Sequence, residues 1–521
     1  MVSACMSESG KFSNLAERPC GAPTHWSTRE IAVRLFLTCW IIYAMHFSTN
    51  IVREIYLTLS IGDHVSFQVD DYARLHPDLF EKPGYGWHIG SNPGVSMLAA
   101  VPYAVAKPVI DMIVQHVRIG REQNHQRPPE YDSPWPMARK FYEESWKRGY
   151  DVKFALGSFV MQALCMAPSS ALGVVAMFLL LQRLLPSPRA ALWLAFLYAF
   201  GTPVFFRTGY LNHNLMLGHI AFGGFLLLWN PFGWSRHSLS ARYYWAGVTG
   251  GTALLFDYSG GIFLIALYLY GLIKACEEES LQARLSLSIR YILGALGPVC
   301  LLWWYQWQSF GHPFLPGQHW MPPVEWIERG YQGVGWPQLD LLSSLLFDYR
   351  YGLFIASPLM LLTFVALRRS SDLRSLFGFR ELWFIFLTFI VLWLFFGGVN
   401  YTRLQFNTGI RYLSPIFPFL FVPVAVTLAQ WPERWVLLIG AMSIAQNWAM
   451  AMYRDVERGL GVLDPLFHIF AGGFQLPLLT TLSRFKGQFG DVFVNGPSPL
   501  PLFALTGVLL YVIWCTRSEP M

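Results

Sequence analysis

Charged and polar side chains stand at the ends of several apolar stretches of this sequence. Asn50, Arg53 and Glu54 follow directly after the first stretch. A carboxylate at the membrane boundary is costly unless it is paired or used. The functional interpretation of Glu54 is a general base, which takes a proton from a reacting hydroxyl. The alternative is an interfacial ion pair of Arg53 with Glu54, or a solvated helix end.

A second pair of carboxylates, Asp70 and Asp71, follows in a turn-like stretch. Adjacent side chains point in different directions on a helix or strand, so we expect one to be functional and the other solvated. Two close carboxylates also suit a divalent cation. The sequence shows no coordination geometry, however, and it therefore indicates neither a metal site nor any other cofactor.

Two further groups interrupt apolar regions. His213 lies between Asn212 and Asn214, and Asp257 separates two apolar half-helices in the stretch LLFDYSGG. The structural interpretation of both His213 and Asp257 is a hydrogen-bonded helix cap. The functional interpretation places both side chains in a site at the membrane face.

Arginines complete the set of chemically active residues. Arg350 lies in the stretch FDYRYGLFIASP, and Arg411 stands at the head of an apolar segment in NTGIRYLSP. A guanidinium keeps its charge at physiological pH and matches the oxygens of a phosphate. The alternative for Arg411 is a snorkelling arginine at the membrane interface.

The composition identifies the kind of chain that must position these residues. Of 521 residues, 54% are hydrophobic and only 13% are charged. A soluble protein carries about a quarter charged residues, so the sequence predicts an all-α polytopic membrane protein. The net charge of +6 is a small excess that membrane proteins commonly reach through basic cytoplasmic loops, and it does not indicate nucleic acid binding.

A membrane-spanning helix needs roughly 20 mostly apolar residues, and about a dozen candidates are present. They include the following segments: Ile31 to Thr49, Phe154 to Leu181, Ala190 to Phe206, Leu215 to Trp229, Ala246 to Phe256, Gly260 to Ile273, Ile292 to Trp304, Leu353 to Leu367, Leu382 to Phe396, Leu413 to Leu428, Val436 to Met452 and Leu500 to Trp514. Residues Pro93 to Val114 are also apolar, but they contain three prolines and a lysine. We expect them to form a membrane-surface helix pair.

Basic residues orient these helices. With residues 1–30 in the cytoplasm, the inside loops contain Arg183, Arg189, Arg236, Arg242, Lys274, Arg284, Arg290, Arg368, Arg369, Arg374, Arg380, Arg434 and Arg517. This distribution follows the positive-inside rule. Residues 31–453 then form the transmembrane core with external loops 50–153 and 310–351, and residues 454–521 form an external loop, a last helix and a short cytoplasmic end. The sequence thus predicts a site at the outer face, made of carboxylates and arginines; it contains no Walker loop, dinucleotide-binding motif, zinc spacing or serine nucleophile elbow.

Several separated patches resemble integral membrane glycosyltransferases of the GT-C fold, in the branch similar to lipid-carrier-dependent mannosyl and aminoarabinosyl transferases. The patches occur in family order over most of the chain: REIYLTLSIGD, FEKPGYGW, NPGVSMLAAVPYAVAKP, GTPVFFRTGYLNHNL, FGHPF, RYGLFIASPLML and GGVNYTRLQFNTGIRYLSPIFPF. The sequence departs from many members in having Asn50 and Arg53-Glu54 where they have Asp or an acidic pair at the end of the first helix. It also has Gly90 and Ser91 where bacterial relatives have Asp-Lys.

The resemblance implies an inverting transferase that moves a sugar from a polyprenyl-phosphate donor to a hydroxyl of a glycan, lipid or protein. By position, Glu54 is the catalytic residue, with Asp70 and Asp71 as competitors. Substrate binding is expected from the following residues: Arg53, His88, Asn92, His213, Asp257, Arg350 and Arg411. The implied location is a bacterial inner membrane, among membrane lipids, with the active site outside.

Two other classes of function remain open from the sequence. A flippase or transporter would move a lipid-linked sugar without chemistry, but paired broken helices are then expected in both halves, and only the Asp257 region looks broken. A non-catalytic membrane scaffold is the other alternative, because a fold alone does not establish activity.

Overall fold

The computed structural model describes most of the chain. The described residues are 26–133, 135–233, 235–323, 325, 330–368, 377–403, 409–453, 461–487 and 498–515. Parts of the predicted terminal segments and of the last external loop, namely residues 1–25, 454–460, 488–497 and 516–521, lie outside them.

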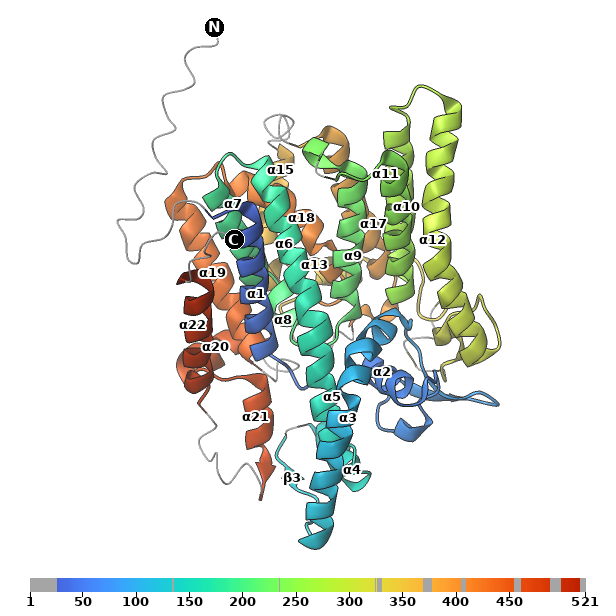
Figure 1. Ribbon diagram of the computed structural model, residues 1–521, viewed down its shortest axis with the longest axis vertical. Coiled ribbons are helices and arrows are strands. Elements are labelled where there is room, and N and C mark those ends of the chain that lie inside the picture. The colour runs from blue at the N-terminus through green and yellow to red at the C-terminus, as the bar shows by residue number, and fades with distance from the viewer. Residues whose placement is uncertain are drawn as a thin grey trace, which may run out of the picture.

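The described residues form a bundle of helices with two small antiparallel sheets (Figure 1). The helices of the first half are α1 (Thr28–Met45), α2 (Arg53–His64), α3 (Gly94–Gln123), α4 (Pro136–Lys147), α5 (Asp151–Met161), α6 (Ala167–Leu184), α7 (Pro188–Phe200), α8 (Val204–Arg207), α9 (His213–Trp229) and α10 (Leu239–Phe256). Those of the second half are α11 (Gly260–Ala275), α12 (Leu281–Phe310), α13 (Leu339–Phe347), α14 (Leu353–Ala356), α15 (Leu362–Arg368), α17 (Phe379–Gly397), α18 (Phe417–Leu428), α19 (Glu433–Met452), α20 (Leu463–Gly472), α21 (Pro477–Ser483) and α22 (Leu500–Cys515). Strand β1 (Leu79–Lys82) pairs with β2 (Gly86–Ile89), and β3 (Glu130–Tyr131) pairs with β4 (Phe485–Lys486).

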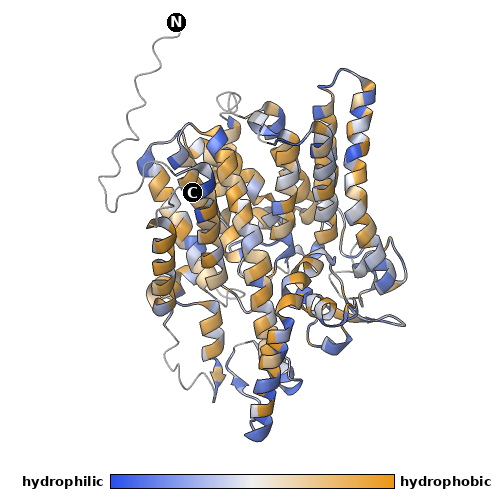
Figure 2. Ribbon diagram, in the orientation of Figure 1, coloured by the Kyte–Doolittle hydropathy of each residue, from blue (hydrophilic) through white to orange (hydrophobic). Residues whose placement is uncertain are grey.

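The length and apolarity of the helices support an integral membrane protein. Five helical segments in the described chain are long and apolar enough to cross a membrane, or six if the bent pair α20 and α21 is one span. Six shorter apolar helices accompany them, so the predicted count of about twelve stays a prediction. Hydrophobic residues predominate along the bundle, and hydrophilic residues gather at its two ends (Figure 2).

The break predicted at Asp257 is present. Helix α10 ends at Phe256 and α11 begins at Gly260, with Asp257 in an extended conformation between them. The start of α10 is capped by Ser238, whose side chain accepts a hydrogen bond from the backbone NH of Ala241. The sequence therefore located both helix boundaries around Asp257 correctly.

The helix pair predicted for Pro93 to Val114 is wrong. The structure has one continuous helix, α3, of 30 residues, with Pro102 and Pro108 inside it. By length and composition α3 could cross a membrane. In Figure 1, however, it lies with α2 and α4 in the lower part of the view, below α1 and α9.

Helices α10 and α12 pack closely through small residues. Gly247 and Gly251 are four residues apart on α10, and a Cβ on Gly251 would lie 2.6 Å from the Ala295 carbonyl oxygen. A Cβ on Gly247 would clash with the Tyr291 carbonyl oxygen, and one on Gly294 with the Tyr244 carbonyl oxygen. Small residues at this spacing let two membrane helices approach at backbone distance.

The lower end of α10 meets the start of α3. A Cβ on Gly94 would lie 2.6 Å from Cδ1 of Phe256 and 2.7 Å from the Leu255 carbonyl oxygen. This contact places Asp257, which follows Phe256 directly, at the same end of the bundle as α2 and α3.

Candidate functional site

Glu54 lies in the first turn of α2 and is almost completely buried. Its backbone carbonyl accepts hydrogen bonds from Thr58 Oγ1 at 2.8 Å and from Ser96 Oγ at 2.9 Å. The second bond fixes α2 against α3. A helix N-terminus favours a carboxylate because its free NH groups carry partial positive charge.

The Glu54 carboxylate has two charged or polar partners. Arg53 Nε lies 3.2 Å from Glu54 Oε1, and His213 Nδ1 donates a hydrogen bond to the same oxygen at 3.0 Å. His213 Nε2 lies 3.5 Å from Asp257 Oδ2. The imidazole therefore sits between two carboxylates that are 203 positions apart in sequence, and the structure brings together four of the predicted site residues.

The position of His213 is fixed by its neighbours on α9. Asn212 is the capping residue, since its side chain accepts a hydrogen bond from the backbone NH of Leu215 at 3.1 Å. The Asn214 amide nitrogen lies 3.1 Å from His213 Nε2. The capping alternative therefore applies to Asn212, and the His213 ring is directed to the carboxylates.

Asp257 combines the two interpretations given to it. Its Oδ1 accepts hydrogen bonds from the Ser259 backbone NH at 2.8 Å and from Ser259 Oγ at 2.6 Å. Its other oxygen, Oδ2, faces His213. Asp257 thus shapes the turn between α10 and α11 and also contacts the imidazole.

Three neighbouring side chains keep Glu54 ionised. Burial alone would raise the pKa of Glu54, but the charges of His213 and Arg53, the hydrogen bond from His213 and the charge of Arg411 hold it well below its usual value. Arg53 also pairs with Asp78, at 3.4 Å, which holds its guanidinium beside the site. Glu54 is therefore ionised and able to accept a proton throughout the physiological pH range.

Arg411 reaches this cluster from the segment before α18. The segment is held by Arg207, a fully buried arginine whose Nε donates to the Ile410 carbonyl and whose Nη2 donates to the Gly409 carbonyl, both at 2.6 Å. Arg411 interacts electrostatically with Glu54 and Arg53. Arg207 was not among the predicted site residues; an arginine within the apolar stretch TPVFFRTGY is the signal that identifies it.

Asn92 lies beside the same cluster at the start of α3. Its side-chain Nδ2 donates to the Leu254 carbonyl at 2.7 Å, which ties the chain before α3 to the end of α10. Its Oδ1 is buried and has no hydrogen-bond partner among the described residues. A buried acceptor without a partner is costly, so this oxygen is free to accept a further hydrogen bond.

The two competing carboxylates have local partners instead. Asp70 Oδ1 accepts a hydrogen bond from the backbone NH of Trp87 at 2.6 Å, and its carboxylate packs against Gly86 in the β1–β2 hairpin. Asp71 is half exposed and lies 3.1 Å from His64 Nε2. The predicted divergence of the two side chains is confirmed, and neither carboxylate contacts the Glu54 cluster through any pair found in the described chain.

His88 and Arg350 also interact locally. The buried ring of His88 contacts the carbonyls of Phe67, at 3.2 Å, and Tyr85, at 2.9 Å, which fixes strand β2. Arg350 is half exposed, and its Nη2 pairs with Asp348 at 3.2 Å. The part of the chain that the structure describes contains no group of three or more His, Cys, Asp or Glu side chains arranged to hold a metal ion.

Comparison with known proteins finds structural similarity only. No protein-family model matches the chain, and no curated protein sequence matches it. The crystal structure of ArnT from Cupriavidus metallidurans in the apo state is similar with a TM-score of 0.49 and 14% identity, over 93% of this chain and 75% of that one. The oligosaccharyltransferase AglB from the archaeon Archaeoglobus fulgidus, in complex with an inhibitory peptide and a dolichol-phosphate, is similar with a TM-score of 0.41 and 14% identity, over 95% of this chain and 62% of that one.

Proposed function

We propose that this protein is a membrane glycosyltransferase that moves a sugar from a polyprenyl-phosphate donor to a hydroxyl acceptor, with inversion at the anomeric carbon. The observation that carries the proposal is the buried Glu54 carboxylate, held ionised by His213 and Arg53 at one end of an apolar helical bundle. The sequence resemblance to lipid-carrier-dependent glycosyltransferases supports the same class of reaction.

In this mechanism the acceptor oxygen attacks the anomeric carbon from the face opposite the phosphate. A carbon–oxygen bond to the acceptor forms while the bond between the anomeric carbon and the phosphate oxygen breaks. The acceptor proton passes to Glu54 as the attack makes the hydroxyl acidic, and the lowered pKa of Glu54 keeps its carboxylate ionised before the attack.

The departing lipid phosphate leaves with an additional negative charge and needs no proton. Arg411, with Arg53 in support, supplies positive charge where that charge develops. Arg350, the other arginine considered for this role, is committed to its exposed pair with Asp348. The polyprenyl tail would lie between helices, and the site would face outward from a bacterial inner membrane, with membrane lipids around the bundle.

The test is transfer of labelled sugar by purified protein, given a panel of polyprenyl-phosphate-sugars together with glycan, lipid and protein acceptors. Wild-type protein is expected to form a covalent product, and Glu54→Gln is expected to abolish it while the protein still inserts and remains monodisperse. Asp71→Asn is the matched control, because Asp71 is a half-exposed carboxylate outside the cluster.

Two results would contradict the proposal. Full activity of Glu54→Gln together with loss of activity in Asp70→Asn would move the base to the hairpin carboxylate. Movement of the labelled lipid across vesicles without a covalent product would instead identify a flippase. Including Asp70→Asn and a flipping assay in the same experiment separates these outcomes.

A further inference from the structure

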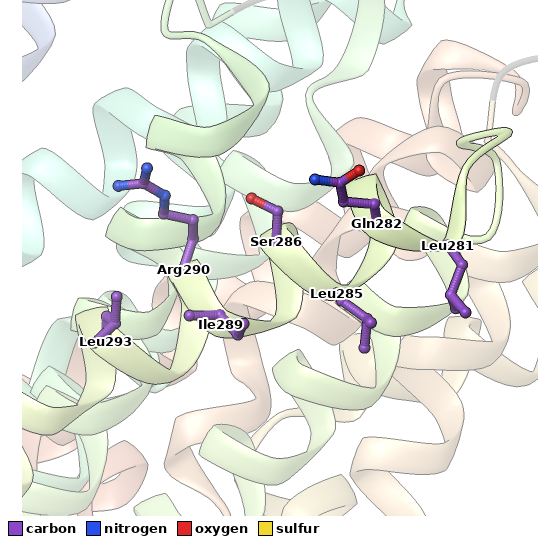
Figure 3. A pocket seen from close by; sticks show the side chains of 7 residues that line it. All are labelled: Leu281, Gln282, Leu285, Ser286, Ile289, Arg290 and Leu293. Carbon is purple, nitrogen blue, oxygen red and sulfur yellow. The ribbon is translucent and has the colours of Figure 1, made fainter.

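A groove of about 730 Å³ runs along one exposed face of α12, and none of its lining residues belongs to the Glu54 cluster (Figure 3). Two stripes of side chains line it. One is polar and consists of Gln282, Ser286 and Arg290; the other is apolar and consists of Leu285, Ile289 and Leu293. Each stripe has a spacing of four residues or close to it, so both follow the helix axis.

Arg290 is the distinctive residue of this groove. The sequence predicts it in an inside loop, but the structure places it within α12, about 13 Å along the helix from Leu281 at a rise of about 1.5 Å per residue. Its side chain is exposed, and no hydrogen bond or ion pair joins it to any other residue of the described chain. Helix α12 is one of the candidate membrane spans.

An exposed arginine in a spanning helix is stabilised where it reaches the membrane interface or meets a negative charge. A charged side chain in the hydrocarbon region is expensive unless it reaches the interface or is neutralised. Helix α12 contains no aspartate or glutamate that could neutralise Arg290. At the interface the phosphate of a lipid is the negatively charged group within reach of Arg290.

We propose that this groove binds the phosphate of an anionic glycerophospholipid, from the membrane leaflet at the end of the bundle where α12 begins. The guanidinium of Arg290 pairs with the phosphate, because its fork of donors matches phosphate oxygens. Ser286 and Gln282 donate to the phosphate or to the glycerol oxygens. One acyl chain lies along Leu285, Ile289 and Leu293. This site is separate from the proposed transferase site and does not depend on it.

The lining of the groove favours this class of ligand over its nearest alternatives. A zwitterionic lipid also has an ammonium group, and the lining residues include no carboxylate to receive it. Free inorganic phosphate would leave the apolar stripe of Leu285, Ile289 and Leu293 without a partner. An anionic lipid satisfies both stripes.

Native mass spectrometry of the detergent-purified protein, titrated with phosphatidylglycerol, tests the proposal. Wild-type protein is expected to retain one phosphatidylglycerol more tightly than phosphatidylethanolamine or phosphatidylcholine. Arg290→Gln is expected to weaken that binding about tenfold, the effect of losing a charged hydrogen-bonding group. Arg290→Lys keeps the charge without the fork and is expected to bind with intermediate affinity.

The matched control is Arg284→Gln, since Arg284 lies on the same helix but donates to the Glu278 carbonyl at 2.9 Å. It is expected to bind phosphatidylglycerol as the wild type does. Equal binding by Arg290→Gln and wild type, or equal losses in the Arg284 and Arg290 variants, would overturn the site. Competition by inorganic phosphate at the same concentration as the lipid would overturn the lipid as its ligand.

Discussion

At the scale of single residues, the ionised state of Glu54 depends on groups from three separate parts of the chain. Arg53 is its neighbour on α2, His213 begins α9, and Arg411 lies before α18. Burial of a carboxylate disfavours its charged form, so these groups must outweigh the cost of burial. The cluster therefore behaves as a unit, and removing one cation changes the proton affinity of the carboxylate.

Replacement of His213 tests this dependence through the pH profile of transfer. The pKa of Glu54 is lowered, so activity that requires the carboxylate is retained at neutral pH and is lost only as the pH falls through that lowered pKa. His213→Ala removes one of the groups that counteract the effect of burial on Glu54, so the pKa of Glu54 rises. The acidic limb of kcat/KM against pH is therefore expected to move to higher pH.

The control for this profile is His64→Ala, because His64 contacts the exposed carboxylate of Asp71 instead. Its acidic limb should coincide with that of the wild type. An unchanged limb in His213→Ala, with transfer still measurable, would show that the acidic limb does not report Glu54.

Replacement of Arg411 tests the stabilisation of the phosphate. Arg411→Gln removes a positive charge from the side of the leaving group, and we expect kcat to fall about a hundredfold, in the range found for the loss of one group that stabilises developing charge. Arg350→Gln removes an exposed arginine that pairs with Asp348, and it should have little effect on kcat. Steady-state kinetics with a saturating donor measure both. The reverse order of effects would assign the phosphate to Arg350.

At the scale of helices, the sequence predicts boundaries well where a polar residue interrupts an apolar run. The end of α10 and the start of α11 around Asp257 are an example, because the carboxylate caps the turn that it creates. Pro102 and Pro108 misled the prediction for α3, since proline removes one hydrogen bond but does not have to end a helix. The two prolines are compatible with a continuous helix and with a broken one, so the sequence of this segment does not distinguish them.

The α10–α12 contact gives a prediction at this scale. Gly247→Ala places a methyl group against the Tyr291 carbonyl oxygen, where the two backbones have no room to separate without losing other contacts. We expect a loss of about 1–3 kcal/mol in stability. The melting temperature of the purified protein should fall accordingly.

Gly297 is the matched control for Gly247. It lies on α12, and a Cβ there meets nothing within 4 Å. Gly297→Ala is expected to leave the melting temperature unchanged or raise it, because alanine favours a helix more than glycine does. Equal melting temperatures for the two variants would show that α10 and α12 do not depend on backbone contact.

At the scale of the whole molecule, the sequence indicates which end of the bundle carries the site but not which residues meet there. Glu54, His213, Asp257 and Arg411 all stand at apolar boundaries on one side, and so does Arg350. The first four come together because α2 and α9 begin where α10 ends, whereas Arg350 pairs with a carboxylate two positions away. The sequence alone does not show whether a charged residue pairs with a near neighbour, as Arg350 does, or with a residue far along the chain. That depends on how the helices pack.

The direction of α3 follows from contacts at the two ends of the helical segment that packs against it. This segment runs from Asp151 to Leu184 and includes α5 and α6. Gln182, near the end of α6, donates to Thr28 at the start of α1. The continuous helix from Asp151 to Leu184 has 34 residues and is therefore about 50 Å long, against about 27 Å for α1. Asp151 thus lies well past the lower end of α1. Arg121, near the end of α3, pairs with Asp151 at 2.7 Å.

It follows that α3 leads away from the bundle and does not return through it. In a background without cysteine, Val65→Cys before α3 and Asn124→Cys after it should react with a membrane-impermeant maleimide from the same side of oriented vesicles. His237→Cys, in the loop between α9 and α10, should react only from the opposite side. Labelling of positions 65 and 124 from opposite sides would make α3 a membrane span. The Arg121–Asp151 pair would then have to lie at the end of the bundle where Gln182 contacts Thr28, which the length of the helix from Asp151 to Leu184 does not allow in this fold.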